Sequence, residues 1–129
     1  MCHAGFGDGV YVSHNDGKSW KNMGLENSEH LSKIIVHPEN SDIIWVASQG
    51  PLWSKGGDRG IYKSINGGKT WQRTLGDSEW VGATDLLIDP TNPNILYAAT
   101  WQRHRTVAGY LGGGPGSGLH KSIDGGLTW

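Results

Sequence analysis

The fold of this chain is decided by Ser122-Ile123-Asp124-Gly125-Gly126-Leu127-Thr128-Trp129, an octapeptide that has two earlier relatives. These run from Ser64 to Trp71 and from Ser13 to Trp20, so the first residues of the three copies are 51 and 58 residues apart. We call the octapeptides box 1 (13–20), box 2 (64–71) and box 3 (122–129). A period of about 50 residues that combines turn residues with aromatic ones is typical of a repeat fold, most often a β-propeller.

A second pair of segments keeps nearly the same spacing. Residues 34–47 match residues 86–99 at an offset of 52, and each segment has an apolar run, a turn rich in Pro and Asn, and another apolar run. Such a segment indicates a β-hairpin, and strands that are apolar throughout are expected to be covered on both faces. The repeat is then a unit of four strands in which the box joins the third strand to the fourth. The predicted strands are 10–13, 20–25, 34–36, 43–47, 60–64, 71–75, 86–88, 95–99 and 118–122.

Four antiparallel strands per repeat make up a propeller blade, and no stretch combines helical periodicity with helix caps. We therefore predict an all-β fold, a partial β-propeller of about two four-stranded blades. Residues 1–31 form the end of one blade, 32–83 a full blade and 84–129 most of the next. A closed propeller needs ~4–8 blades. We thus expect a segment of a larger propeller whose partners are the remaining blades, and expect the isolated chain to be unstable or oligomeric.

Composition excludes several classes of partner. Glycine makes up 21 of the 129 residues, more than twice the usual ~7%, and predicts many turns. A net charge of −1 without a basic run argues against nucleic acid as a partner, and no apolar segment reaches the ~20 residues of a membrane span. Cys2 is the only cysteine, so no internal disulfide is possible. Residues 1–6 show no signal peptide pattern, and the six histidines have no metal-ligand spacing. We expect neither a cofactor nor a metal.

The box itself has the chemistry of a tight turn. The side-chain oxygen of Asn66 or Asp124 can accept hydrogen bonds from backbone N–H groups of the turn, and the glycines supply positive φ. Trp71 is expected to bury its ring between adjacent blades, and box 1, with Asp16 in place of a glycine, is expected to have a looser turn. We therefore predict structural roles for the defining residues of the boxes: Ser13, Asn15, Gly17, Trp20, Ser64, Asn66, Gly68, Trp71, Ser122, Asp124, Gly126 and Trp129.

The pattern S-x-[DN]-x-G-x-[ST]-W, present three times, resembles the Asp-box (BNR) repeat proteins. Extended by the preceding hairpins and by G-[IL]-[YH]-K, it is similar to the Vps10/sortilin-type propeller and to related bacterial proteins like glycosyl hydrolase family 74. This resemblance implies a propeller fold, an extracellular or periplasmic location, and a polypeptide or carbohydrate ligand. Because one propeller fold hosts many functions, the resemblance does not imply a particular activity.

Two departures argue against catalysis in this segment. The [FY]-R-I-P motif of sialidases is missing. Family 74 enzymes place a catalytic aspartate directly after the second strand of a blade, and the matching positions here hold Gln49 and Trp101. Neither side chain can serve as general acid or base.

The strand order separates two ends of the sheets. The boxes and the short Pro/Asn turns share one end, while the long connections 48–59, 76–83 and 100–117 share the other, where ligand contacts are expected. Aromatic residues beside charges suit a sugar, a peptide or a protein interface. The alternative for Trp53 and Trp101 is packing against neighbouring blades. The predicted ligand-binding residues are Trp53, Arg59, Glu79, Trp80, Trp101, Arg103, His104 and Arg105.

Three functions remain open at this point. The leading hypothesis is a non-catalytic binding or scaffold segment of a sortilin-like propeller. The second is part of a polysaccharide-acting glycoside hydrolase, with carboxylates outside this segment or among Asp77, Glu79 and Asp85. The third is a purely structural repeat. His37, which matches Asp89 in the repeat, is expected to shape a turn.

Overall fold

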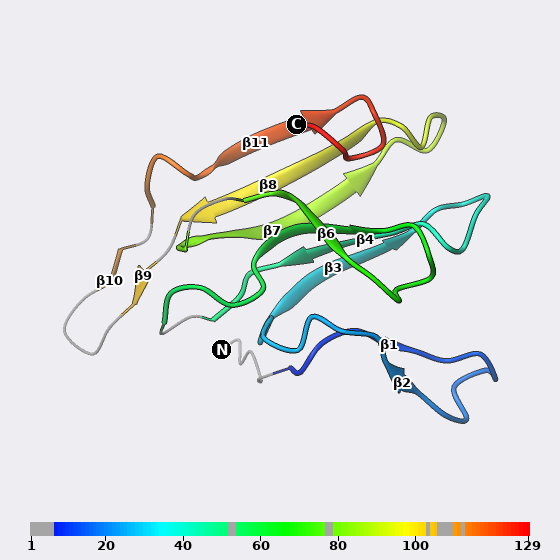
Figure 1. Cartoon of the computed structure of the whole chain (residues 1–129). Coiled ribbons are helices and arrows are strands. Elements are labelled where there is room, and N and C mark those ends of the chain that lie inside the picture. Colours follow the sequence, from blue (N-terminus) through cyan, green and yellow to red (C-terminus); the bar gives the residue numbers. More distant parts are fainter. Residues whose placement is uncertain (1–6, 52–53, 77–78, 103, 106–109, 112) are drawn as a thin grey trace.

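The structure is a computed structural model that describes residues 7–51, 54–76, 79–102, 104–105, 110–111 and 113–129. These residues form β-strands and turns, and none of them is helical. The strands, labelled in Figure 1, are β1 (Tyr11–Val12), β2 (Lys21–Asn22), β3 (Leu31–Val36), β4 (Ile44–Ser48), β5 (Gly60–Ser64), β6 (Gln72–Leu75), β7 (Val81–Ile88), β8 (Leu96–Gln102), β9 (His104–Arg105), β10 (Tyr110–Leu111) and β11 (Gly118–Ser122).

The strands pair as the repeat predicts. β3, β4, β5 and β6 form one antiparallel sheet in sequence order, β7, β8 and β11 form a second sheet in the order β11-β8-β7, and β1 pairs with β2. Every strand pair is antiparallel, as in propeller blades. The all-β partial propeller predicted from the sequence is confirmed.

Several strand bounds differ from the prediction. β3 begins at Leu31 and β7 at Val81, earlier than expected, and each contains a register irregularity against its partner, at Leu31/Lys33 and at Ala83/Asp85. Such bulges let a strand continue past the point where the apolar pattern breaks. In addition, β9 and β10 pair with each other in the long connection between β8 and β11, which the sequence predicted to be loop.

The core lies between sheets laid against one another. Trp45, Ala47 and Ile61 of the four-stranded sheet pack against Leu86 and Ala98, among others, of the three-stranded sheet. A second cluster joins the opposite face of the four-stranded sheet to Val10 and Leu25 of the first hairpin region. Because that sheet is covered on both faces, all five residues of β4 are buried. This explains why its sequence is apolar without alternation.

Glycines allow the third and fourth strands of a repeat to approach closely. Gly9 and Gly60 occupy equivalent positions and have φ of 122° and 113°. A Cβ on Gly60 would lie 2.1 Å from the Leu75 carbonyl oxygen, and one on Gly9 would lie 2.2 Å from the Gly24 carbonyl oxygen. Both contacts are with backbone, which cannot move aside without breaking the pairing. Each of these positions therefore requires glycine for two reasons: its φ is positive, and there is no room for a Cβ.

The sheets have two chemically different ends. Figure 1 shows the boxes and the β3–β4 and β7–β8 turns at one end, and the described parts of the β4–β5 and β6–β7 connections, with strands β9 and β10, at the other. We call these the turn end and the loop end.

Candidate functional site

At the turn end, each box is a turn that satisfies its own polar groups. In box 2 the Ser64 hydroxyl donates to Asn66 Oδ1 (2.9 Å) and accepts from the Gly68 N–H (2.8 Å), while Asn66 Oδ1 also accepts from the Thr70 N–H (3.0 Å). The corresponding bonds recur in boxes 1 and 3. The polar groups that the sequence singled out in the boxes are thus engaged within the turns.

Box 1 is not looser than the others. Asp16 has φ of 59°, close to the 72° of Gly67 and the 74° of Gly125, and the hydrogen bonds of the box are kept. The expectation of a looser turn is wrong because aspartate tolerates the left-handed conformation better than most residues.

Box 3 differs from the other two in carrying a carboxylate, that of Asp124, at the position where they carry the amides of Asn15 and Asn66. In box 2 the Asn66 amide donates to the Thr70 hydroxyl (2.7 Å). In box 3 the direction is reversed, and the Thr128 hydroxyl donates to Asp124 Oδ2. Hydrogen bonds from Thr128, and then from Ser122 and the Leu127 N–H, hold the pKa of Asp124 well below its usual range. The ionised form of Asp124 is therefore the one that the folded turn prefers.

We expect box 3 to be acid-sensitive while box 2, which has Asn66 in the place of Asp124, is not. A depressed folded-state pKa contributes stability that is present above the unfolded pKa of about 3.9 and is lost as pH falls below it. Asp124→Asn removes this dependence, so the difference in unfolding free energy between wild type and variant should shrink from pH 7 to pH 3. Urea unfolding at several pH values measures it. Asn66→Asp is the matched control and should add the same acid dependence at box 2. Parallel stability profiles for wild type and Asp124→Asn would contradict the assignment.

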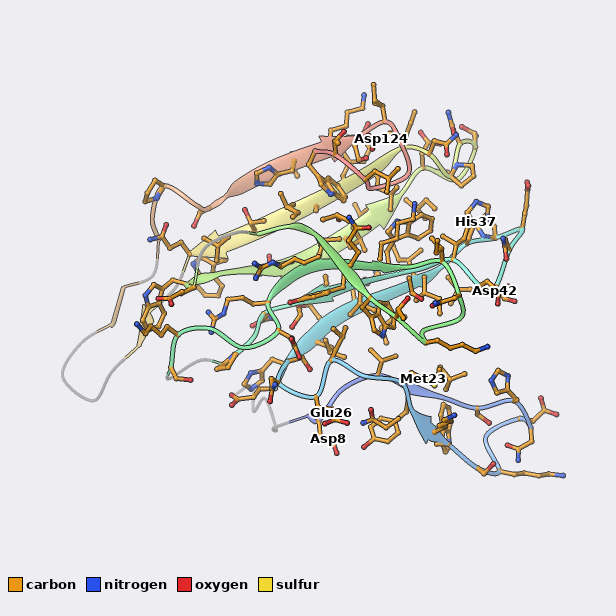
Figure 2. All side chains as sticks on the ribbon, viewed as in Figure 1. Asp8, Met23, Glu26, His37, Asp42 and Asp124 are labelled. Atoms are coloured by element: carbon orange, nitrogen blue, oxygen red, sulfur yellow. The ribbon has the colours of Figure 1, made fainter. Side chains whose placement is uncertain are left out.

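The turns between first and second strands complete the turn end. The Gly67 N–H donates to the Asp42 carbonyl (2.9 Å), and the Gly125 N–H donates to the Asn94 carbonyl (2.9 Å), so boxes 2 and 3 are each hydrogen-bonded to the neighbouring turn. His37, Asp42 and Asp124 lie together at this end in Figure 2.

His37 and Asp89 have the same role in these turns, because each side chain accepts a hydrogen bond from the backbone N–H two residues later. His37 Nδ1 accepts from the Glu39 N–H (3.1 Å). Asp89 Oδ1 accepts from the Thr91 N–H and hydroxyl, which lowers the pKa of Asp89. The turn-shaping role expected for His37 agrees with this geometry.

The tryptophans of boxes 2 and 3 fasten neighbouring sheets. The indole N–H of Trp71 donates to the Met23 carbonyl (2.7 Å), and that of Trp129 donates to the Thr74 hydroxyl (3.2 Å). Met23 and Thr74 are equivalent positions of the repeat. We call the contact between two neighbouring sheets a seam. Across the seam between the four-stranded and three-stranded sheets, the Trp45 indole of β4 also donates to the Gly125 carbonyl of box 3 (2.9 Å). These hydrogen bonds at the turn end therefore connect adjacent blades.

The loop end brings together three of the predicted ligand-binding residues. Arg59, Trp80 and Trp101 line one small cavity between the four-stranded and three-stranded sheets. Its other lining residues are Gln49, Pro51, Gly82 and Thr84. The cavity holds about 10 Å³, room for about a single water. A ligand larger than water therefore meets the rims of the two indole rings, which are half-buried, instead of entering the cavity.

Arg59 is buried at the loop end, where it bonds to the connection between β4 and β5. Only 2% of its surface is exposed. Its guanidinium donates to the carbonyls of Gly56 (2.6 Å), Pro51 (2.8 Å) and Ser54 (2.9 Å), and lies 6.0 Å from the ring centre of Trp80. An arginine bonded to three carbonyls of one loop fixes the shape of that loop. Arg59 thus holds the loop in place, with its guanidinium beside the Trp80 ring.

Glu79 lies at the surface of the loop end. Its carboxylate is 3.4 Å from Lys55 Nζ, and both side chains are largely exposed. Such a pair is worth about 0–1 kcal/mol. The Glu79 carbonyl also accepts from the Gly56 N–H (2.9 Å), which links the β4–β5 and β6–β7 connections.

Four of the predicted ligand-binding side chains are not located. Trp53 and Arg103 lie outside the described residues, as does Asp77, a candidate carboxylate of the hydrolase hypothesis. Of His104 and Arg105 only the strand β9 is described.

Sequence reasoning did not single out His30, Gly82 or Thr84. His30 is buried with Nδ1 3.2 Å from the Gly50 carbonyl oxygen, and a Cβ on Gly82 would lie 2.3 Å from the Gln49 carbonyl oxygen.

Two features are absent from the described residues. Among them, no group of three or more His, Cys, Asp and Glu side chains is placed to hold a metal ion. Nor do these residues include a helix with the length and apolar character needed to cross a membrane.

Three features together define a segment of a β-propeller: the order of the strands in the sheets, the hydrogen bonds between neighbouring sheets and the box turns. A family model described as "Sortilin, neurotensin receptor 3" (Sortilin-Vps10) matches residues 8–129, and the chain belongs to this family. Among solved structures, the crystal structure of an ancestral GH74 enzyme is similar over 98% of this chain, with a TM-score of 0.68 and 26% sequence identity. This chain spans 15% of the length of that structure's chain. No curated protein matches. The resemblance inferred from the motifs is confirmed.

Proposed function

We propose that this chain is a non-catalytic binding or scaffold segment of a sortilin/Vps10-type propeller and that its ligand contacts the loop end. The observation that carries the proposal is the described lining of the seam cavity. It offers two indole rings, an amide, a hydroxyl and a buried arginine, and no carboxyl group.

The chemistry of glycoside hydrolysis supports a non-catalytic role. Most glycoside hydrolases need two carboxyl groups on opposite sides of the scissile bond. The two positions where the family 74 resemblance places a catalytic aspartate, Gln49 and Trp101, both line this cavity. An amide and an indole cannot exchange a proton near neutral pH, so neither residue replaces the missing acid.

The exposed chemistry of the loop end favours a polypeptide or a carbohydrate. Trp80 and Trp101 offer apolar ring surface at a rigid seam, and the Lys55–Glu79 pair offers polar groups beside it. Flat rings with nearby hydrogen-bonding groups suit sugar stacking and the burial of peptide side chains. Both ligand classes agree with an extracellular or periplasmic location, which we include in the proposal.

A hydrolase is the second candidate because the solved neighbour is a GH74 enzyme. Its carboxylates would have to come from outside this segment or from the connection that leads into β7. Of the described candidates, Glu79 is paired with Lys55, and Asp85 is exposed and accepts from the Leu86 N–H.

Isothermal titration with xyloglucan oligosaccharides and with a panel of short peptides tests the proposal. We expect binding to one class without turnover, and at least a ~10-fold loss of affinity in Trp80→Ala and Trp101→Ala, because aromatic anchors carry much of such binding. Ile65→Ala, an exposed side chain at the turn end, is the control and should bind as wild type. Turnover of xyloglucan that disappears in Glu79→Gln or Asp85→Asn would establish the hydrolase instead. Absence of binding to either panel would favour the purely structural repeat.

A further inference from the structure

Box 2 contains the one Asn-Gly pair of the sequence, Asn66-Gly67. Asparagine is a thermolabile residue. It is most reactive before glycine, because a residue without a Cβ does not shield the asparagine side chain from the backbone nitrogen that follows it. Box 1 has Asn15 at the same position, followed by Asp16, and box 3 has Asp124. The three boxes therefore hold a reactive pair, a hindered pair and the residue that forms when the amide is lost.

Loss of the amide joins the Gly67 nitrogen to the Asn66 side chain. The nitrogen attacks Asn66 Cγ, the Cγ–Nδ2 bond breaks, and the amide nitrogen leaves as ammonia with the proton of the Gly67 N–H. Water then opens the resulting succinimide ring. If the bond from the nitrogen to Cγ breaks, position 66 becomes aspartate. If the bond from the nitrogen to the backbone carbonyl carbon breaks, it becomes isoaspartate, whose main chain runs through Cβ and Cγ.

The closed box holds the groups that this reaction uses. Asn66 Oδ1 accepts from the Ser64 hydroxyl (2.9 Å) and the Thr70 N–H (3.0 Å), and Asn66 Nδ2 donates to the Thr70 hydroxyl (2.7 Å). The attacking group, the Gly67 N–H, donates to the Asp42 carbonyl (2.9 Å). Attack requires that this nitrogen lose its proton and that the amide leave its partners, so the box has to open first.

The contacts that keep box 2 closed lie inside the chain. Asp42 belongs to the turn between β3 and β4 of the same sheet. The Trp71 indole, at the end of the box, donates to the Met23 carbonyl across the seam (2.7 Å). The hydrogen bonds named for box 2 are therefore all made within residues 23–71, and none of them depends on a further blade.

Box 3 shows that aspartate suits this turn. Asp124 Oδ1 accepts from the Ser122 hydroxyl (2.8 Å) and the Thr128 N–H (2.9 Å), and Asp124 Oδ2 accepts from the Thr128 hydroxyl. Aspartate at position 66 can form the same bonds once the Thr70 hydroxyl turns to donate instead of accept. An aspartyl box 2 therefore closes again.

Isoaspartate does not suit the turn. The Gly68 N–H donates to the Ser64 hydroxyl (2.8 Å), which in turn donates to Asn66. These two bonds close the chain between residues 64 and 68 at a fixed length. One added main-chain atom at position 66 breaks this closure and displaces Trp71 from the Met23 carbonyl.

We propose that Asn66 is a modification site: it deamidates through Gly67 when box 2 opens, and the aspartyl product closes again while the isoaspartyl product does not. The change is covalent and therefore outlasts the opening that allowed it. A chain whose turn end has opened is thus marked at position 66.

Peptide mapping by mass spectrometry, after incubation of the chain in mildly alkaline buffer with and without urea, is the first test. In urea, Asn66 should lose its amide faster than Asn15, the control within the same chain. Without urea, where circular dichroism checks the fold, Asn66 should react at least ~10-fold more slowly than in urea, because the closed box protects it. Equal rates at Asn66 and Asn15 in urea would overturn the site. Equal rates at Asn66 in the two conditions would overturn the role of opening.

Thr70→Val removes the hydroxyl that accepts from the Asn66 amide and keeps the backbone N–H. It should speed deamidation of the folded chain by ~3-fold or more, the effect of one lost hydrogen bond. Thr70→Ser is the matched control and should react as wild type, because Ser19 holds this position in box 1 and accepts from the Asn15 amide (2.7 Å). The same rate in both variants would contradict protection by the hydroxyl. If Thr70→Val does not fold, the wild-type comparison still decides the proposal.

The two products are tested separately. Asn66→Asp encodes the aspartyl product and should unfold in neutral buffer at the same urea concentration as wild type. The isoaspartyl product, isolated by chromatography after incubation in urea and returned to buffer, should unfold at a lower urea concentration. Equal midpoints for the two products, or an Asn66→Asp chain that does not fold, would overturn the distinction between them.

Discussion

Replacing Gly60 with alanine should destabilise the chain by ~3 kcal/mol or more, or prevent folding. Two costs add at this buried position. The φ of 113° is one that side-chain-bearing residues rarely adopt, and the new Cβ would stand 2.1 Å from the Leu75 carbonyl oxygen. That oxygen belongs to a backbone paired with β5, so relief requires the separation of β5 from β6. Urea unfolding followed by circular dichroism measures the loss.

The same repeat provides the control. Gly118 is the equivalent of Gly60 at the start of β11, but the nearest atom to a Cβ placed there is His120 Nε2 at 3.6 Å. Gly118 also has no positive φ in the strained range. Gly118→Ala should therefore change the unfolding free energy by less than about 1 kcal/mol. Equal losses in the two variants would contradict the argument, because they would trace the cost to the shared sequence position instead of to the close approach of β6.

These glycines show how far the sequence predicts the fold. The repeat, the strand order and the separation of turn end from loop end followed from turn residues and apolar runs, because those features act locally. The distance between β5 and β6 did not follow, since nothing in the Gly60 segment specifies how near Leu75 lies. The same is true of β9 and β10, whose short pairing lacks an apolar pattern.

The loop end could be predicted only in part. The long connections with charged and aromatic residues made Arg59, Trp80 and Trp101 candidates, and the structure places all three at one cavity. Their contact with a ligand stays a prediction. The burial of Arg59 could not be foreseen, because it depends on a loop that turns back on itself at Gly50, Gly56 and Gly57, all with positive φ. A charged side chain in a loop is exposed unless tertiary structure supplies carbonyls to it.

The extent of β8 explains the position of Trp101. The apolar pattern predicts a strand that stops at Ala99, but pairing continues to Gln102, with Trp101 opposite Gly82. Because Gly82 of β7 has no side chain, the Gln49 backbone can approach β7 at this point. Trp101 consequently lies at the seam between two sheets. Its half-buried ring leaves both interpretations, ligand contact and packing between blades, open as predictions.

Replacing Trp45 with alanine should cost about 3–5 kcal/mol, the usual range for loss of a buried tryptophan. The ring is 1% exposed at the centre of the larger core cluster, and its indole N–H donates to Gly125 of box 3. Lys63 Nζ lies 5.6 Å from the ring centre, and burial there lowers the pKa of Lys63. Removal of the ring therefore opens the seam and leaves the Gly125 carbonyl without its partner.

Tyr97→Ala is the matched control for Trp45→Ala, because Tyr97 holds the same repeat position and carries Lys121 over its ring at 5.7 Å. Tyr97 is half-buried and lies outside the core cluster that contains Trp45, so its loss should cost less than about 1.5 kcal/mol. Urea unfolding followed by circular dichroism, in dilute solution, measures both losses. A loss for Tyr97→Ala in dilute solution as large as that for Trp45→Ala would mean that the ring's stabilising contacts are made within its own sheet, and the account of the seam as the source of stability would be wrong.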